Sequence, residues 1–212
     1  MTEKTAQKEP GKKPVPSKKP KPQQEVVVQI SLSELHPFPD HPFQVREDAS
    51  MQETAESVKE YGVLVPALAR PREDGGYELI AGHRRKHACE LAGLATMPVI
   101  VRDIDRDAAT IIMVDSNLQR KNILPSERAK AYKMKMEAIK RQGARTDLTS
   151  PKISAKFRSD DEVGQDAGVS GDTIRNYIAL TQLVPELQQM VDEKKIALSP
   201  AYQLAALTPK EQ

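Results

Sequence analysis

Five consecutive basic or titratable side chains, at positions 83–87, open a predicted helix in the stretch ELIAGHRRKHACELAGL. A helix N-terminus carries the positive end of the helix dipole and unpaired N–H groups, so cations there are unfavourable unless an anion binds among them. Gly82 lets the backbone approach a phosphate closely, and the guanidinium groups of Arg84 and Arg85 match phosphate oxygens in pairs. The pattern predicts a site for a di- or triphosphate, against the alternative of a surface helix with a basic start.

The two histidines of this run, His83 and His87, stand four residues apart, a spacing that also occurs in metal sites. The neighbouring Arg84, Arg85 and Lys86 would repel a divalent ion, and no carboxylate completes a ligand set within the motif. We therefore reject a metal pair. Phosphate contact is predicted for His83, and packing or solvation for His87.

A second polar cluster, Asn117, Gln119 and Arg120, lies near the end of a helix predicted over residues 106–122. The apolar residues before the cluster bury this helix, so its polar side chains need hydrogen-bond partners. Two explanations remain open. The cluster ends and caps the helix, or it converges on the same anion as Arg84, with Asn117 as an oxygen ligand of phosphate-bound magnesium.

The pattern around the cationic run predicts a small α/β unit between residues 26 and 106. β-Branched residues indicate a strand from Val26 that leads into a short helical turn, and the proline-rich residues 36–48 indicate a loop. The further predicted elements are a helix over 51–61 ending at Gly62, a hairpin with its turn at Asp74, Gly75 and Gly76, the helix after Gly82 ending at 92–93, and a strand over 97–104.

The sequence beyond this unit has a helical pattern. Residues 124–143 predict a helix with Ser126 as its cap and Gly143 at its end. Residues 144–159 are polar and are predicted to form a connection or hinge, and residues 184–207 are predicted to form one long and one short helix.

Residues 160–183, DDEVGQDAGVSGDTIRNYIALTQL, have the spacing of a helix-turn-helix motif. Small and apolar residues pack the two helices, a glycine makes the turn and a serine caps the second helix. A helical hairpin without a DNA role is the alternative. The residues assigned to these places are Val163 and Gly164 in the first helix, Gly168 in the turn, Val169 buried after it, Ser170 as the cap, and Ile174 and Ile178 on the inner face of the second helix.

The start of the second helix supplies candidate DNA contacts, because such residues meet base edges in the major groove. Arg175 can pair with guanine and Asn176 with adenine. Phosphate would repel Asp172, so Asp172 is expected to stabilise the helix start or to reject wrong sites. The predicted DNA-binding residues are Ser170, Gly171, Thr173, Arg175 and Asn176.

Composition limits the kinds of partner. Residues 1–24 hold seven Lys against two Glu with five Pro, and are predicted to be a disordered basic tail, either a solvated linker or a weak contact for nucleic acid. Because the whole chain carries +2, the rest is near −3, so any nucleic-acid contact must be local. The single Cys89 is expected to be a packed residue, and without an apolar run of about 18 residues we expect a cytoplasmic protein with no membrane contact.

Three of these stretches resemble, in order, motifs of the ParB/RepB partition-protein family. HPFQVR is similar to the family's Asn-Pro-x-Gln-Pro-Arg loop, AGHRRKHACELAGL to its Gly-Glu-Arg-Arg-x-Arg-Ala motif, and DSNLQRKNILPSERAKAY to its Glu-Asn-Leu-Gln-Arg motif with the helix that follows. GVLVPALARP, which begins at Gly62, also resembles the family's entry to the strand before the phosphate motif. The resemblance covers residues 26–207.

The resemblance implies a DNA-binding clamp that uses CTP and magnesium. In this family, nucleotide binding closes the N-terminal domains of a dimer around DNA, and the loaded dimer slides away from its site. The implied partners are double-stranded DNA with a palindromic site, a second copy of the chain and a ParA-type ATPase, at the nucleoid. The implied nucleotide-binding residues are Gly62, Gly82, His83, Arg84, Arg85, Asn117, Gln119 and Arg120, with Asn117 also facing the metal ion.

Two departures from the family pattern bear on the chemistry. His83 stands where the family has Glu, which exchanges an anion for a side chain that can be a cation beside the phosphates. Ser116 stands where the third motif begins with Glu, the expected metal ligand and water-orienting group, and the neighbouring Asp115 points about 100° away. Nucleotide binding is therefore expected with weak or absent hydrolysis, and no catalytic residue is assigned.

The predicted function is a site-specific DNA-binding partition protein, switched by CTP, that acts in chromosome, plasmid or mobile-element segregation. The alternative is a helix-turn-helix regulator on the same scaffold without nucleotide switching. A sulfiredoxin-like enzyme is disfavoured, because its motif needs a Cys between glycine and histidine, whereas Gly82 directly precedes His83.

The predicted fold class is α+β, with a small mixed α/β N-terminal domain followed by an all-α helix-turn-helix domain. The predicted divisions are the tail over 1–24, the α/β domain over 25–106, a helical connection with the third motif over 107–143, and the DNA-binding domain over 144–212.

Overall fold

The computed structural model describes residues 25–120, 122–147 and 159–212. The predicted disordered tail and most of the predicted connection over 144–159 lie outside these residues. Within them, a five-stranded mixed sheet precedes a mainly helical part, so the predicted α+β class is confirmed. The strands lie in the order β1-β5-β3-β4-β2 and are β1 (Val27–Ser31), β2 (Leu35–Pro37), β3 (Ala67–Pro71), β4 (Tyr77–Ala81) and β5 (Thr96–Val101).

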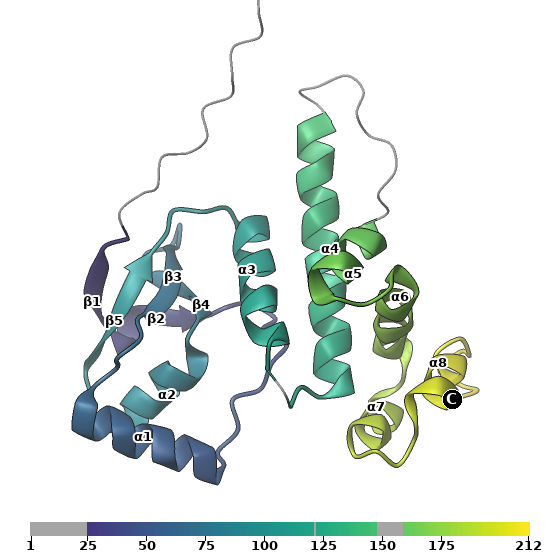
Figure 1. Cartoon of the computed structure of the whole chain (residues 1–212), viewed down its shortest axis with the longest axis horizontal. Helices are drawn as coiled ribbons and strands as arrows, with labels where there is room; N and C mark the ends of the chain where they lie inside the picture. The colour runs from purple at the N-terminus through teal and green to yellow at the C-terminus, as the bar shows by residue number, and fades with distance from the viewer. Residues whose placement is uncertain (1–24, 121, 148–158) are drawn as a thin grey trace, which may run out of the picture.

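The helices divide between the sheet and a second group on the other side of one long helix (Figure 1). Two short 3-10 turns, η1 (Leu32–Glu34) and η2 (Leu180–Gln182), complete the pattern. The α-helices are α1 (Ala49–Tyr61), α2 (His83–Leu91), α3 (Arg106–Leu118), α4 (Pro125–Asp147), α5 (Ser159–Ala167), α6 (Gly171–Ala179), α7 (Pro185–Asp192) and α8 (Leu198–Leu204).

Both faces of the sheet are covered by helices. Leu79 and Ile80 are consecutive in β4 and fully buried, and strand alternation sends them to opposite faces. Leu79 packs in a core that contains Met51 of α1 and Cys89 of α2, whereas Ile80 packs in a core that contains Met113 of α3. The helix that carries the cationic run and the helix that leads to the second polar cluster therefore lie on opposite faces.

Local signals placed most elements of the sheet correctly. The predicted helix ending at Gly62 and the predicted hairpin between β3 and β4 are confirmed. The predicted loop over 36–48 is wrong at its start, because β2 pairs in parallel with β4 at the sheet edge. Leu35, only 2% exposed, anchors this strand in the core, and Pro37 is tolerated there because an edge strand can do without one N–H donor.

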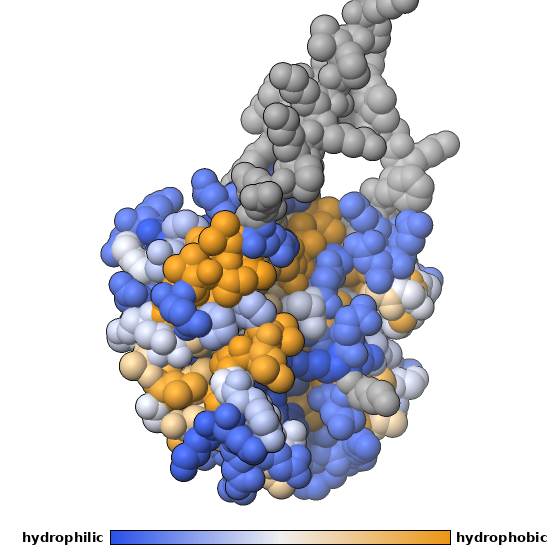
Figure 2. Space-filling model, turned by 60° about the vertical axis from the view of Figure 1, so that its left-hand side comes forward, coloured by the Kyte–Doolittle hydropathy of each residue, from blue (hydrophilic) through white to orange (hydrophobic). Residues whose placement is uncertain are grey.

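The opposite edge of the sheet, β1, exposes apolar side chains. Val26, Val27 and Val28 are 66%, 51% and 43% exposed. Figure 2, with this side turned forward, shows apolar surface in separate patches among hydrophilic residues. This side therefore presents no single continuous apolar face among the described residues. In the same ranges, no helix combines the length and apolarity that a bilayer crossing requires.

The long helix α4 packs against α3 on one side and against α5, α6 and α7 on the other. It places Ala131 in the core under the sheet, Ala129 in a core with α7 and α8, and Tyr132 in the core of the helix-turn-helix. Two predictions about this helix are wrong. Gly143 does not end it, and Ser126 lies inside its first turn, where its hydroxyl donates to Asp192 of α7 at 2.5 Å.

The helix-turn-helix has the predicted framework with one correction. Val163 and Ile174 are fully buried, and Ser170 caps α6. Val169, predicted to be buried, is 37% exposed. Tyr132 of α4 completes the core that Val163 and Ile174 share, and Val169 lines a cavity beside Tyr132.

The helices after α6 are both short, which corrects the prediction of one long and one short helix. The segment Pro185–Asp192 ends where Lys194 adopts a left-handed backbone, and Lys195 N–H closes the turn on the Met190 carbonyl at 2.8 Å. This turn directs the chain back into α8, which packs in the same core as α7.

A buried lysine joins three helices. Lys135 of α4 is 1% exposed, and its ammonium donates to Asp115 of α3 at 2.6 Å and to Asp166 of α5 at 2.8 Å. Burial alone would lower the pKa of Lys135, but the hydrogen bonds and negative charges of the two carboxylates outweigh it and raise the pKa above its usual value. Lys135 is therefore a charged link between α3 and α5.

The exposure of the three partners predicts an asymmetric response to mutation. Asp115 and Asp166 keep side-chain exposures of 45% and 56%, so Lys135→Met leaves two hydrated carboxylates and should lower the free energy of unfolding by less than about 1.5 kcal/mol. The double variant Asp115→Asn/Asp166→Asn leaves the buried ammonium of Lys135 without a negative charge beside it. This variant should lower the free energy of unfolding by about 3 to 5 kcal/mol. Urea unfolding measures both free energies, and equal losses would mean that the charge of Lys135 does not need the two carboxylates.

Candidate nucleotide and DNA sites

The three motif stretches meet around one cavity of about 330 Å³, although they are far apart in the sequence. This volume is within the range of small-ligand sites. The cavity takes Gln44 and Arg46 from HPFQVR, Arg84 from the start of α2, and Arg120 and Asn122 from the segment after α3. We call it the arginine cavity.

The arginine cavity is electrostatically suited to an anion. Its two carboxylates accept from backbone N–H groups: Asp48 from Met51 at 2.9 Å, and Glu127 from Gln44 at 3.0 Å and from Leu124 at 3.1 Å. Asp48 also lies 3.7 Å from Nη2 of Arg84. Burial and the nearby positive charge of Arg84 lower the pKa of Arg120. The three arginines of the cavity, Arg46, Arg84 and Arg120, outnumber its two carboxylates, which favours a ligand that brings negative charge.

The start of α2 has the backbone geometry that the sequence predicted. Gly82 precedes the helix with φ +114°, and a Cβ there would lie 2.8 Å from Cβ of Ala67, so only glycine fits. Arg85 does not line the arginine cavity; its Nη1 donates to the carbonyls of Val65 and Pro66 at 2.6 and 2.5 Å. In this arrangement Arg85 holds the loop that follows Gly62.

The second polar cluster is divided in space. Arg120 lines the arginine cavity, but Asn117 is 4% exposed and donates to the Met113 carbonyl within its own helix at 2.8 Å. Gln119 lines a different cavity of about 460 Å³ that also contains Asp166 and Val169. Of the eight predicted nucleotide residues, Arg84 and Arg120 line the arginine cavity.

The described residues offer little support for a resident metal ion. Within them, no group of three or more His, Cys, Asp or Glu side chains is arranged to hold one. Nδ2 of Asn117 donates to the Met113 carbonyl, so only Oδ1 of this buried side chain could coordinate magnesium, and the hydroxyl of Ser116 donates to the same carbonyl at 2.9 Å. Asp115, the neighbouring carboxylate, is held by Lys135.

His83 packs against His41 of the HPFQVR motif. The ring centroids lie 3.9 Å apart with an interplanar angle of 43°. Burial, with the nearby His41, Arg120 and Lys86, lowers the pKa of His83 to about 3. The expectation that His83 can be a cation beside the phosphates is therefore wrong for the protein without a ligand, where the imidazole is neutral.

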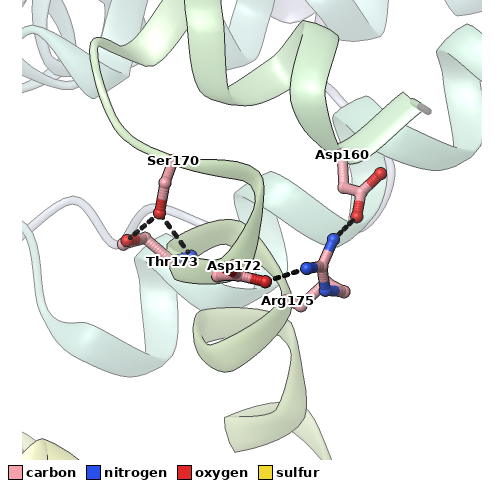
Figure 3. A network of polar contacts seen from close by, with 5 residues as sticks. All are labelled: Asp160, Ser170, Asp172, Thr173 and Arg175. Atoms are coloured by element: carbon pink, nitrogen blue, oxygen red, sulfur yellow. Dashed lines mark hydrogen bonds and ion pairs between the residues drawn. The ribbon is translucent and has the colours of Figure 1, made fainter. Parts of the chain in front are cut away.

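Figure 3 shows the polar network at the start of α6. Ser170 Oγ accepts from Thr173 N–H at 3.2 Å and lies 2.9 Å from Thr173 Oγ1, which confirms the predicted cap. Arg175 donates from Nη1 to Asp160 of α5 and from Nη2 to Asp172. Asn176 is exposed beside this network.

Gly171 has a packing role that the sequence did not reveal. It is buried, and a Cβ there would lie 2.2 Å from Oδ1 of Asp161. Gly164 allows a similar approach, since its Cβ would lie 2.6 Å from the Val169 carbonyl. Both glycines let α5 and α6 meet closely, whereas Ser170, Arg175 and Asn176 are the predicted DNA contacts that lie exposed.

Several cavity residues were missed by reasoning from the sequence. Arg46, Ser50 and Asn122 line the arginine cavity, and Arg84 donates to Ser50 Oγ at 3.3 Å. Arg46 could have been found, because it ends the quoted HPFQVR motif. Asn122 likewise lies in the quoted DSNLQRKNILPSERAKAY stretch. Ser50 carries no signal of its own, since only the folded chain brings it to Arg84.

The low pKa of His83 predicts a pH dependence of stability. The unfolded chain protonates His83 near its usual pKa of 6.5, whereas the folded protein resists protonation down to about pH 3, so unfolding takes up a proton in between. The free energy of unfolding should fall by about 1 to 2 kcal/mol from His83 alone between about pH 7 and pH 5. The free energy of unfolding of His83→Gln, measured with urea at several pH values, should change less with pH than that of the wild type. An equal pH dependence of the two proteins would contradict this.

Comparisons with known proteins agree on one family. The ParB N-terminal domain matches residues 16–118, and the ParB HTH domain matches residues 151–212. The chromosome-partitioning protein Spo0J of Thermus thermophilus is 34% identical over 187 residues, which cover 88% of this chain and 62% of that protein. Stage 0 sporulation protein J of Bacillus subtilis is 30% identical over 189 residues, 89% of this chain and 61% of that protein. The chain thus spans less than two thirds of these relatives.

A solved structure is similar over both parts of the chain. It is the C-terminally truncated chromosome-partitioning protein ParB of Caulobacter crescentus, complexed to the centromeric parS site. The identity is 26%, the TM-score is 0.54, and the match covers 87% of this chain and 88% of that one. With an N-terminal sheet domain and a helix-turn-helix that both match in sequence, the chain belongs to the ParB family.

Proposed function

We propose that this chain is a site-specific DNA-binding partition protein whose N-terminal domain binds a nucleoside triphosphate as a switch. The observation that carries the proposal is the convergence of three distant motifs on the arginine cavity, where three arginines outnumber two carboxylates. The family resemblance names CTP as the nucleotide.

The DNA part of the proposal is supported by the helix-turn-helix and by the relatives. The start of α6 exposes Ser170, Arg175 and Asn176, as a recognition helix requires. Relatives are named chromosome-partitioning proteins, and the similar Caulobacter crescentus protein is complexed to a centromeric site. By the same resemblance we propose a palindromic site in double-stranded DNA, a dimer, a ParA-type ATPase partner and a place at the nucleoid.

Nucleotide turnover is proposed to be weak or absent. Ser116 replaces the expected Glu and donates to its own helix, and Asp115 is committed to Lys135. Magnesium would therefore arrive with the triphosphate and keep water ligands, as this ion commonly does, without a carboxylate cage from the protein. The nucleotide would act through binding, with little contribution from hydrolysis.

One observation favours the second candidate, a helix-turn-helix regulator without nucleotide switching. Asn117 and Gln119 do not line the arginine cavity, so part of the third motif is separated from the proposed phosphate site. Measured nucleotide affinity separates the two candidates.

Calorimetric titration of the protein with CTP, ATP, GTP and UTP in magnesium buffer tests the nucleotide site, with phosphate release followed in parallel. CTP-selective binding with little phosphate release is expected. Arg84→Ala and Arg120→Ala should each weaken CTP binding about 10- to 100-fold, because each removes charged hydrogen bonds to phosphate. Arg72→Ala, in the hairpin outside the cavity, is the matched control and should bind normally.

Two outcomes would contradict this. Equal affinity of the Arg84→Ala, Arg120→Ala and wild-type proteins would place the nucleotide elsewhere. No binding of any nucleotide, with DNA binding intact, would leave the regulator as the function.

The DNA reader is tested with a duplex library randomised over about 20 base pairs, enough for two half-sites one helical turn apart. The protein should enrich a palindrome. Asn176→Ala should bind the enriched duplex about tenfold more weakly and discriminate less at one base pair of each half-site, since one bidentate contact is lost. Gln52→Ala, on α1 of the sheet domain, is the control, and the same loss in both variants would argue against α6 as the reader.

A further inference from the structure

The proposed recognition helix carries an arginine that already has two acidic partners. Nη1 of Arg175 donates to Asp160, at the start of α5, and Nη2 donates to Asp172, three residues earlier on α6 (Figure 3). The side chain of Arg175 remains 41% exposed. Its guanidinium is therefore held at the surface by contacts from two different helices before any DNA binds.

The two carboxylates differ in burial, which separates their roles. The side chain of Asp160 is 8% exposed, whereas that of Asp172 is 78% exposed. Asp160 also lies in the first turn of α5, where the helix dipole favours a negative charge. The exposed carboxylate of Asp172 can replace its contact with Arg175 by water. The buried carboxylate of Asp160 cannot do so readily, so Asp160 is the more rigid of the two contacts.

The charge balance around Arg175 favours contact with a base over contact with a phosphate. Both acceptors that Arg175 contacts are carboxylates, and each of them repels a DNA phosphate that approaches the same guanidinium. A guanidinium has five N–H donors, so three remain after Arg175 donates to Asp160 and Asp172. Guanine requires two donors, for O6 and N7.

We propose that Asp160 is a positioning residue for DNA recognition: it holds the guanidinium of Arg175 so that Arg175 reads a base edge and not the phosphate backbone. This inference rests on the proposed DNA-binding function. Fixing a long arginine side chain in advance removes part of the entropy cost of ordering it on binding. The same carboxylates penalise a phosphate placed against α6, which rejects misaligned sites.

The test compares Asp160→Asn with Glu162→Gln, which removes the same charge from the same turn of α5 at an exposed position. Affinity is measured at one fixed salt concentration for the palindrome that the wild-type chain enriches and for an unrelated duplex of equal length. Asp160→Asn should bind the unrelated duplex at least as tightly as wild type but the palindrome about tenfold more weakly. Glu162→Gln should shift both affinities by one small common factor.

A double-mutant cycle separates positioning from a merely structural role. In an Arg175→Ala background, Asp160→Asn should leave the ratio of the two affinities unchanged, because the positioned side chain is gone. A further loss of discrimination in that background, or a parallel shift in Asp160→Asn and Glu162→Gln, would overturn the proposal. A wild-type chain that enriches no sequence would instead overturn the proposed DNA-binding function.

A measurement on the wild-type chain decides the matter if Asp160→Asn fails to fold. Nitrogen-15 NMR of arginine side chains reports rotation of the guanidinium about its Cζ–Nε bond. Arg175, assigned by comparison with Arg175→Lys, should show separate Nη1 and Nη2 signals in the DNA-free protein, because two different helices hold the two nitrogens. One averaged Nη signal would mean that the side chain is not held, and would overturn the proposal.

Discussion

The buried ammonium of Lys135 is the interaction on which the arrangement of the two functional parts depends. An apolar side chain in the same place would hold α3 and α5 together without regard to direction, whereas a buried cation requires carboxylates at hydrogen-bond distance. Asp115 and Asp166 meet that requirement from α3 and α5. If the helix-turn-helix moves away from α3, the ammonium of Lys135 must therefore be hydrated or must find another carboxylate. The segment that leads to Arg120 and the helix that precedes the DNA reader are joined by one ion bridge.

The helix that carries Lys135 makes this link possible because it belongs to every core around it. Ala131, Ala129 and Tyr132 are close neighbours in α4, yet they pack in three different clusters. A helix with apolar contacts on several sides cannot rotate to follow one domain without exposing side chains that face another. The region predicted from the sequence as a helical connection is thus a shared structural support, and Ser126 extends it by binding Asp192 of α7.

Reasoning from the sequence succeeded where a signal is local and failed where the partner is distant. The caps and turns at Gly62, Gly82 and Ser170 depend on neighbouring residues, and these predictions were confirmed. Val169 lies exposed in a cavity beside Tyr132 of α4, and the charge of His83 depends on burial beside His41, which comes from a loop 42 positions earlier. Neither could be read from the sequence, because both depend on which segments the fold brings together.

The carboxylates have different partners in the two candidate sites, and this difference would allow a chain with little net charge to bind the two polyanions proposed as its ligands. In the arginine cavity, Asp48 and Glu127 accept from backbone N–H groups and are outnumbered by Arg46, Arg84 and Arg120, which favours an anion. On α6, Asp160 and Asp172 contact Arg175 itself, so in the proposed arrangement they would weaken its attraction for phosphate and leave its remaining donors for a base edge. A strong attraction of the arginines for phosphate suits a small ligand, because the shape of the cavity selects that ligand. A weak attraction for phosphate suits DNA, because every wrong register of DNA offers the same phosphates and only the bases differ.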